Sequence, residues 1–325
     1  MKKILSLFII LTVVLSVLGG CSLLPDDIKA CKVNFYVDNE LYDTKLGIIG
    51  QTINLPEAPE KENLIFVGWY TNGVLVYEVD SSTKLTGNTD LYAHYVIDAI
   101  PLNDMIAKET VKSIVTVKNR SYNTAPGTLI ESSFSSSQGS GVVVDISGGY
   151  CYVLTNYHVV DMAEGFSKQK LSVEDPWGNV YEAQIYKGVS KSQYAMSMEY
   201  DLALLCFKYF GTAESDLKEI TMSENPKINE YIVALGSPEG LKNTATYGSV
   251  LSYELIKADD DSNLKNINFD IILHDAFIDH GSSGGALVNM KGELVGINFA
   301  GYSSGKYGCA IPIAKIKEFM NIYVY

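Results

Sequence analysis

Residues 279–287 read Asp279-His280-Gly281-Ser282-Ser283-Gly284-Gly285-Ala286-Leu287. A serine in a tight, glycine-rich turn can act as a nucleophile, because the backbone N–H groups of such a turn can point at one spot and bind an oxyanion. Glycine permits main-chain conformations that other residues avoid, so the backbone can approach a substrate closely. Taken alone, the stretch is more typical of a flexible surface turn, which Gly/Ser runs usually form.

Two other segments favour the catalytic interpretation. The β-branched run at residues 152–160 carries His158 near its end, and residues 200–205 place Asp201 at the start of an apolar run. The chain order is therefore His158, Asp201 and then Ser283. That order is found in chymotrypsin-like enzymes and in neither subtilisins nor α/β-hydrolases.

The three segments resemble the T-N-x-H-V-V, D-L-A-L-L and G-N-S-G-G-A-L blocks of the HtrA/Deg serine peptidases, a branch of the trypsin-like superfamily. The likeness runs from about residue 103 to the C-terminus and includes residues 139–144, 295–298 and 308–312. It implies a mainly β fold: two six-stranded β-barrels with the active site in the cleft between them, followed by a C-terminal helix. Short strands and turns after residue 139 are typical of such a fold.

The resemblance assigns a role to each residue of the blocks. Ser283 would be the nucleophile, and it needs a base because a hydroxyl is inert at neutral pH. His158 would accept its proton and pass it to the leaving amine, while Asp201 would fix the imidazole tautomer. The backbone N–H groups of Gly281 and Ser283 would form the oxyanion hole.

Other residues compete for these roles. Asp201 is preferred as the acid because the apolar run after it predicts burial, which an unpaired carboxylate would not tolerate. Ser282 stands one position from the nucleophile of the family, where Asn or Asp is usual. His280 and His274 are too close in sequence to Ser283 to face it across a cleft, and His280 replaces a common proline. The remaining candidate acids are Asp161, Asp270, Asp275 and Asp279.

The substrate-specificity residues also follow from the resemblance. Phe277 lies six residues before Ser283, at the floor of the specificity pocket of trypsin-like enzymes. Because Phe277 is apolar, we expect a small or aliphatic side chain before the scissile bond and no preference for basic residues. Gly296, Ile297 and Asn298 are expected to provide a strand edge that pairs with an extended substrate.

The N-terminal residues 1–20 are typical of a secretory signal, with Lys2 and Lys3 before an apolar run that ends at Leu18. That run is shorter than the roughly 20 residues that span a bilayer. Residues 18–21 resemble the lipobox of bacterial lipoproteins, in which the cysteine, here Cys21, is acylated. An uncleaved membrane anchor is the alternative. Both place the catalytic domain on the extracytoplasmic face of the cell membrane.

Residues 31–98 form a separate unit, joined to Cys21 by a short tether at residues 21–30. Val33, Phe35 and Val37 alternate with polar neighbours, as in a strand. The unit resembles the Listeria–Bacteroides (internalin B-type) repeat, which is small and β-grasp-like. Two interpretations of its Trp69 and Tyr70 are a ligand-binding aromatic pair and core residues; the core is expected, because aromatic side chains dominate the burial in such small domains. The unit would act as a spacer or bind a surface ligand.

The protease domain is predicted over residues 99–325, with a mobile Ser/Thr-rich loop at residues 122–138. We expect no PDZ domain, because the sequence ends after a helical segment at residues 313–323. No Cys/His spacing suggests a metal site, and no cofactor is expected. The remaining cysteines are expected to be free thiols in apolar strands: Cys31, Cys151, Cys206 and Cys309.

Composition limits the classes of partner. A chain of 325 residues with 47% hydrophobic and 19% charged residues is typical of a globular protein of about two domains. A net charge of −13 argues against nucleic acid, whose phosphates require clustered Lys and Arg. The same charge disfavours adsorption to anionic lipid headgroups.

The predicted function is a membrane-anchored extracytoplasmic serine endopeptidase of HtrA/Deg type, which cleaves unfolded or extended polypeptides through an acyl-enzyme intermediate. A catalytically inactive surface adhesin or holdase on the same scaffold is the alternative. An esterase with the same three residues is disfavoured, because the chain has no Gly-x-Ser-x-Gly elbow between strand and helix.

Overall fold

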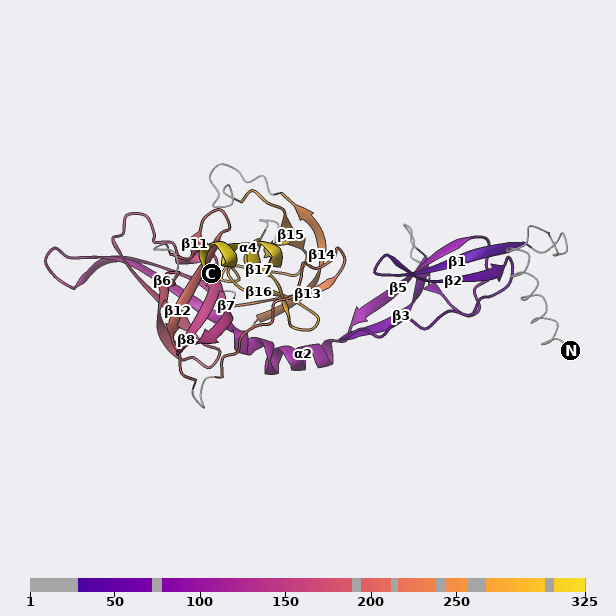
Figure 1. The fold of residues 1–325 in the computed structure, drawn as a ribbon, viewed down its shortest axis with the longest axis horizontal. Coiled ribbons are helices and arrows are strands. Elements are labelled where there is room, and N and C mark those ends of the chain that lie inside the picture. The colour runs from indigo at the N-terminus through magenta and orange to yellow at the C-terminus, as the bar shows by residue number, and fades with distance from the viewer. Residues whose placement is uncertain are drawn as a thin grey trace. The chain divides into compact units, whose positions relative to one another are not determined.

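A computed structural model describes residues 29–71, 78–188, 194–211, 216–237, 244–255, 267–301 and 307–324. The chain divides into two compact units, Met1–Asp98 and Ala99–Tyr325 (Figure 1). The predicted signal peptide at residues 1–20 and the predicted lipidation site Cys21 lie outside the described residues. Among the helices that are described, none combines the length and the apolar character needed to cross a membrane.

The smaller unit is a five-stranded sheet with strand order β2-β1-β5-β3-β4. The central strands β1 and β5 are parallel, and all other neighbours are antiparallel. Alternation along β1 buries Val33 and Phe35 completely, as its sequence predicts. The strands are β1 Ala30–Val37, β2 Glu40–Ile48, β3 Leu64–Thr71, β4 Glu78–Val79 and β5 Thr89–Ile97.

The two neighbouring aromatic residues of β3 lie in different environments. Trp69 is buried, packs edge-on against Phe35 with ring centroids 4.9 Å apart, and donates its indole N–H to the Pro56 carbonyl at 2.9 Å. Tyr70 is only half-buried and contacts the exposed His94 ring. The expectation of a core position is therefore confirmed for Trp69 and wrong for Tyr70, because successive strand residues point to opposite faces.

The larger unit begins with helix α2, Ala99–Lys108, and the 3₁₀ turn η1, Thr110–Ser113. A closed first barrel follows, with strand order β10-β9-β6-β7-β8-β12 and closure between β10 and β12. Its interior is filled by apolar side chains from every strand, and β12 is buried along nearly its whole length. The strands are β6 Ile114–Thr124, β7 Glu131–Ser147, β8 Tyr150–Thr155, β9 Lys168–Glu174, β10 Val180–Ile185 and β12 Leu202–Lys208, with the short β11 Met196–Ser197 beside β12.

The segment at residues 122–138 corrects the sequence-based expectation of a loop. Residues 122–124 and 131–138 continue β6 and β7 as antiparallel strands joined by a turn at residues 125–130, and this ribbon, which is two-stranded beyond the β9 pairing that ends at Tyr122, extends away from the barrel (Figure 1). The Arg120 guanidinium lies 3.7 Å from the centre of the Phe134 ring and forms an ion pair with Glu131 at 2.6 Å. These cross-strand contacts hold the ribbon together although its sequence is rich in serine.

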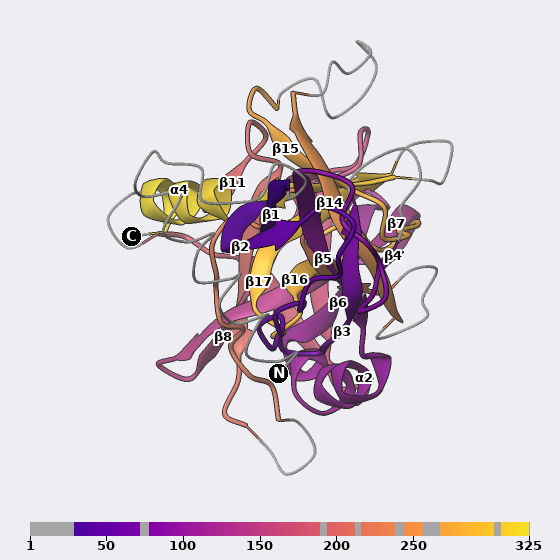
Figure 2. The same cartoon turned by 90° about the vertical axis from the view of Figure 1, so that its right-hand side faces the viewer.

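The second barrel closes with the order β13-β14-β15-β18-β17-β16. It ends in helix α4, Ile313–Tyr323, which packs beside β17 and β18; Figure 2 shows this helix at the periphery. Pro312 precedes the first turn, where a missing N–H is harmless. The predicted fold class is confirmed. The strands are β13 Tyr231–Gly236, β14 Thr244–Glu254, β15 Ile271–His274, β16 Ala286–Asn289, β17 Leu294–Gly301 and β18 Gly308–Pro312.

The cysteines of the described residues are all buried and free: Cys31, Cys151, Cys206 and Cys309. Burial raises the pKa of the Cys151 and Cys309 thiols to about 12. Because the thiolate is the reactive form, these side chains act as small apolar residues at neutral pH.

Candidate active site

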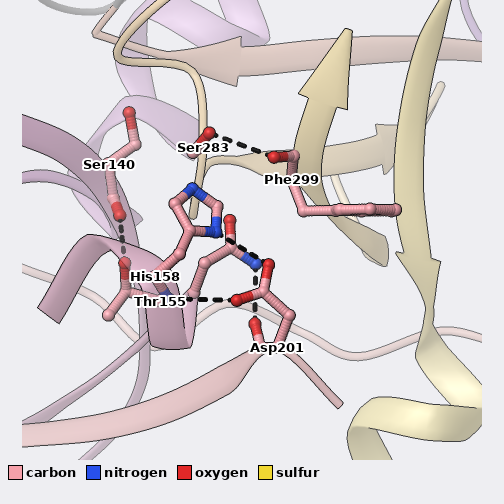
Figure 3. A network of polar contacts seen from close by, with 7 residues as sticks. Ser140, Thr155, His158, Asp201, Ser283 and Phe299 are labelled. Carbon is pink, nitrogen blue, oxygen red and sulfur yellow. Dashed lines mark hydrogen bonds and ion pairs between the residues drawn. The ribbon is translucent and has the colours of Figure 1, made fainter. Parts of the chain in front are cut away.

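His158 and Asp201 meet because their strands are neighbours. β8 and β12 are antiparallel, with Thr155 opposite Ala203. His158 follows the end of β8 in the single helical turn α3, Tyr157–Val160, and Asp201 directly precedes β12. His158 Nδ1 lies 2.8 Å from Asp201 Oδ2, and the His158 backbone N–H donates to Asp201 Oδ1 at 3.0 Å. The carboxylate therefore fixes the histidine through both of its oxygens (Figure 3).

The Asp201 turn is held tightly. Asp201 is buried and adopts a left-handed conformation with φ of 48°, which is uncommon for a residue other than glycine. The Asn156 side-chain amide donates to the Asp201 carbonyl at 2.9 Å. The preceding Tyr200 donates its hydroxyl to Glu318 of α4 at 2.5 Å. Such outside support is what keeps an unfavourable backbone conformation in place.

Three of the four other candidate acids bind groups other than His158, and the fourth, Asp270, has no described contact with His158. Asp161 Oδ1 accepts the Tyr157 hydroxyl, Asp275 Oδ1 accepts the Ser249 amide, and Asp279 Oδ1 accepts the adjacent His280 amide. Asp201 is thus the acid that the fold brings to His158.

Ser283 lies in the turn between β15 and β16, and Figure 3 shows the His158 ring lying between Asp201 and Ser283. The Ser283 hydroxyl donates to the Phe299 carbonyl at 3.2 Å. Within the described contacts it forms no hydrogen bond with His158. Proton transfer from Ser283 to His158 therefore requires the hydroxyl to rotate away from Phe299, an adjustment common on substrate binding.

The two amides expected to form an oxyanion hole are available. Gly281 N–H and Ser283 N–H donate no hydrogen bond among the contacts of the described residues. The amides around them are engaged: Ser282 N–H donates to the Asp279 carbonyl at 2.9 Å and Gly284 N–H to the Asn298 carbonyl at 2.8 Å. Two free donors beside Ser283 are what stabilisation of a tetrahedral oxyanion needs.

A small pocket opens beside this turn, with a volume of about 20 Å³, or roughly one water molecule. Phe277 and Asn298, which the sequence analysis assigned to substrate specificity, are among the residues that line it. The sequence analysis did not assign the other residues that line the pocket to it: Ala234, Leu235, Gly236, Thr244, Thr246, Ile278, Asp279 and Ser282.

The structure corrects the expected substrate-binding strand edge at residues 296–298. Gly296 and Ile297 do not line the pocket and pair with β16 on one side and β18 on the other. Asn298 N–H donates to the Gly285 carbonyl, so it too is engaged. The β16 pairing ends at Ile297, and within the part of the chain that the structure describes residues 299–301 of β17 have no strand partner on that side. A fully paired strand cannot add a substrate strand.

His274 serves a different purpose from His158. Its side chain is fully buried, and Nε2 lies 3.2 Å from Asn298 Oδ1. Burial lowers the pKa of His274 to about 4, so the ring is neutral near pH 7. The Asn298 amide in turn donates to the Ala286 carbonyl at 3.0 Å. His274 thus supports the strand behind the nucleophile turn and takes no place across the cleft from Ser283.

The His274→Gln variant is expected to change the pH dependence of stability. The folded-state pKa lies below the unfolded value of about 6.5, so the unfolded chain binds the extra proton. Wild-type stability should then fall by about 3 kcal/mol as the pH drops from 6.5 to 4. Urea unfolding of the larger unit at several pH values should show this loss largely removed in His274→Gln. Substitution of the exposed His94 in the other unit is the control, and an unchanged slope in His274→Gln would contradict the assignment.

Comparison with known proteins identifies both units. Residues 139–297 match the trypsin-like peptidase domain, and residues 32–94 match the Listeria-Bacteroides repeat domain. The chain is 38% identical over 182 residues to the serine protease HTRA1 of Xenopus laevis, covering 56% of this chain and 35% of that protein. It is 38% identical over 188 residues to a probable periplasmic DegP-like serine endoprotease of Buchnera aphidicola, covering 55% of this chain and 35% of the relative. The chain thus spans about a third of the length of these curated relatives.

The fold and the site together define the larger unit as a trypsin-like serine peptidase domain. Within that class it is similar to the serine proteases named HtrA and DegP, and the smaller unit is a Listeria-Bacteroides repeat domain, as the sequence motifs predicted.

Sequence reasoning missed some residues around the site. Asn156, which holds the Asp201 carbonyl, and Thr155 stand in the T-N-x-H block, so their proximity to His158 was the available signal. Phe299, which accepts the Ser283 hydroxyl, follows the residues expected to bind substrate. No comparable local pattern distinguishes Phe299 from an ordinary strand residue.

Proposed function

We propose that this chain is a serine endopeptidase of HtrA/Deg type, which cleaves unfolded or extended polypeptides through Ser283, His158 and Asp201. The observation that supports the proposal most is the 2.8 Å contact between His158 Nδ1 and Asp201 Oδ2 next to the Ser283 turn. That contact leaves the opposite ring nitrogen, Nε2, as the proton acceptor.

The proposed reaction has two halves, acylation of Ser283 and hydrolysis of the acyl-enzyme, and each catalytic group acts in both. Ser283 Oγ attacks the peptide carbonyl while His158 Nε2 takes the hydroxyl proton, and Asp201 stabilises the imidazolium. Gly281 N–H and Ser283 N–H bind the resulting oxyanion. His158 then donates the proton to the leaving amine, which breaks the C–N bond and leaves an acyl-enzyme. Water, deprotonated by His158, hydrolyses this ester and restores the Ser283 hydroxyl.

The substrate class follows from the shape beside Ser283. A pocket of about 20 Å³, roughly the space of one water molecule, has no space for a Lys or Arg side chain; within the expected class of small or aliphatic residues it favours a small one before the scissile bond. The free side of residues 299–301 offers backbone groups to an extended polypeptide. A polypeptide must be locally unfolded to present such a strand.

We further propose that the protease works at the membrane. Residues 1–20 would direct export, Cys21 would carry the lipid anchor, and residues 21–30 would form the tether. Residues 31–98 would act as a spacer or bind a surface ligand, and residues 99–325 would carry the protease on the extracytoplasmic face of the cell membrane. The motif at residues 18–21 supports this arrangement.

A second candidate function is a catalytically inactive adhesin or holdase. The observation in its favour is that the Ser283 hydroxyl donates to Phe299 and not to His158. In an inactive scaffold this arrangement would be permanent, whereas in a protease it would end when substrate binds.

Labelling with a fluorophosphonate probe tests the proposed function. The probe reacts only with a serine that is activated by a base and an oxyanion hole. We expect a stoichiometric adduct on Ser283, located by mass spectrometry of proteolytic fragments, and cleavage of casein by unlabelled protein. Absence of both the adduct and cleavage, with and without an unfolded polypeptide present, would favour the adhesin or holdase.

A further inference from the structure

Ser140 connects the two barrels at the nucleophile turn. It belongs to β7 of the first barrel and is completely buried. Its hydroxyl donates to the Gly281 carbonyl at 2.7 Å and accepts the Ser237 amide at 2.9 Å, and its own amide donates to the Ser283 carbonyl at 2.7 Å. All these partners belong to the second barrel or its connections, so one residue of the first barrel holds the turn from outside.

The carbonyls bound by Ser140 belong to Gly281 and Ser283, the two residues whose amides donate no described hydrogen bond. The peptide plane that carries Ser283 N–H lies between the plane held at the Gly281 carbonyl and the plane held at the Ser283 carbonyl. Gly281 has φ of 97° and Gly284 has φ of 84°, so the turn is built from residues with unusual conformational freedom. A flexible turn keeps two amides pointing at one spot only if its neighbouring planes are fixed.

The packing around Ser140 leaves no room for side chains. A Cβ atom on Gly284 would lie 2.1 Å from the Ser140 carbonyl oxygen, and one on Gly139 would lie 2.8 Å from the Ser283 carbonyl oxygen. The close approach of β7 to the turn therefore requires glycine on both sides of the contact. This explains why Ser140 is preceded by glycine in a strand, where glycine is otherwise unfavourable.

Ser140 also contacts the segment that carries the base. The Thr155 hydroxyl donates to the Ser140 carbonyl at 2.6 Å, and Thr155 is the last residue of β8, three positions before His158 (Figure 3). One buried residue thus links the histidine segment to the nucleophile turn.

We propose that Ser140 is a positioning residue that holds the oxyanion hole in its active form and ties it to the His158 segment. The inference rests on the proposed protease function and assigns a role within that same site. Ser140 itself touches no reacting atom, and it acts through Gly281 and Ser283.

The alternative role for the buried Ser140 hydroxyl is simply to hold the two barrels together. The structure offers a matched control that separates this role from positioning of the turn. Thr116 of β6 is buried and its hydroxyl lies 3.0 Å from the Ser237 hydroxyl, so this contact also joins the two barrels. Thr116 has no described contact with the nucleophile turn. Loss of docking should affect Thr116→Val and Ser140→Ala alike, whereas loss of positioning should affect Ser140→Ala alone.

The test compares full-length wild type, Ser140→Ala and Thr116→Val with a peptide substrate and a peptide boronate, whose tetrahedral anion occupies an oxyanion hole. Ser140→Ala is expected to lower kcat about 100-fold and to weaken the boronate similarly, with little change in KM. Thr116→Val should match wild type in all three. Equal losses in both variants, or a Ser140→Ala variant as active as wild type, would overturn the proposal.

Hydrogen exchange gives a readout that does not depend on activity. Exchange in residues 279–285 should be faster in Ser140→Ala than in wild type and unchanged in Thr116→Val; equal exchange in all three would overturn the positioning role even if the wild type proves inactive. Should Ser140→Ala fail to fold, Thr155→Val removes only the hydrogen bond to the Ser140 carbonyl. It should show a smaller loss of kcat, again without a change in KM, and unchanged kinetics there would contradict the link to the His158 segment.

Discussion

Replacement of Ser283 by alanine is expected to abolish proteolysis of casein, with a loss of about 10⁶-fold in kcat. The variant keeps the His158–Asp201 pair and the free amides but has no oxygen to attack the peptide carbonyl. The turn itself should survive, because its hydrogen bonds run through backbone groups of Ser283 and its neighbours. Cleavage is measured by release of labelled fragments, after circular dichroism has shown that the variant is folded.

Ser282→Ala is the matched control for this variant. Ser282 lies one position away, and among the contacts of the described residues its hydroxyl accepts a single hydrogen bond, from the Asp279 amide at 3.2 Å. Loss of one such hydrogen bond should reduce activity by about tenfold or less. If Ser283→Ala remained fully active while Ser282→Ala did not, the nucleophile would have been assigned to the wrong serine.

Asp201→Asn is expected to lower kcat by about 10⁴-fold while leaving the fold intact. The carboxylate accepts two hydrogen bonds from His158, one through each oxygen. Asparagine has a single oxygen, and if this oxygen keeps the His158 backbone N–H, its NH₂ group faces Nδ1. Nδ1 must then be unprotonated, which places the proton on Nε2, where the ring can no longer accept the serine proton.

The measurement for this variant is kcat and KM with a chromogenic peptide. KM should change little, because Asp201 is buried behind His158 and does not face the substrate pocket. Asp161→Asn is the control, since Asp161 contacts the Tyr157 hydroxyl and not the imidazole. A comparable loss of kcat in Asp201→Asn and Asp161→Asn would show that the rate depends on negative charge near His158 and not on the His158 tautomer.

The two barrels were predicted from the resemblance of three sequence blocks to the HtrA/Deg peptidases, with His158, Asp201 and Ser283 in the matching order. In the structure β8 and β12 pair, and this pairing brings His158 to Asp201. The burial of Asp201, in contrast, was predicted from its own neighbours, because an apolar run follows it in β12.

Other features depend on contacts that local patterns do not encode. The sequence could not reveal that the Ser283 hydroxyl points to Phe299, because a hydroxyl rotamer is set by neighbours distant in the chain. The same holds for Gly296 and Ile297, whose strand is apolar whether or not its edges are paired. The ribbon at residues 122–138 was missed because serine-rich sequence is typical of loops, and its strand pairing is stabilised by contacts such as that of Arg120 with Phe134.

The buried thiols have a practical consequence for measuring this molecule. Cys31 lies in the repeat unit, Cys151 and Cys206 lie in strands β8 and β12 of one barrel, and Cys309 lies in the other, so every folding part carries at least one concealed sulfhydryl. A maleimide reagent can modify each only when the surrounding strands separate. The alkylation rate at each cysteine would therefore report how often the surrounding part of the fold opens, without any engineered probe.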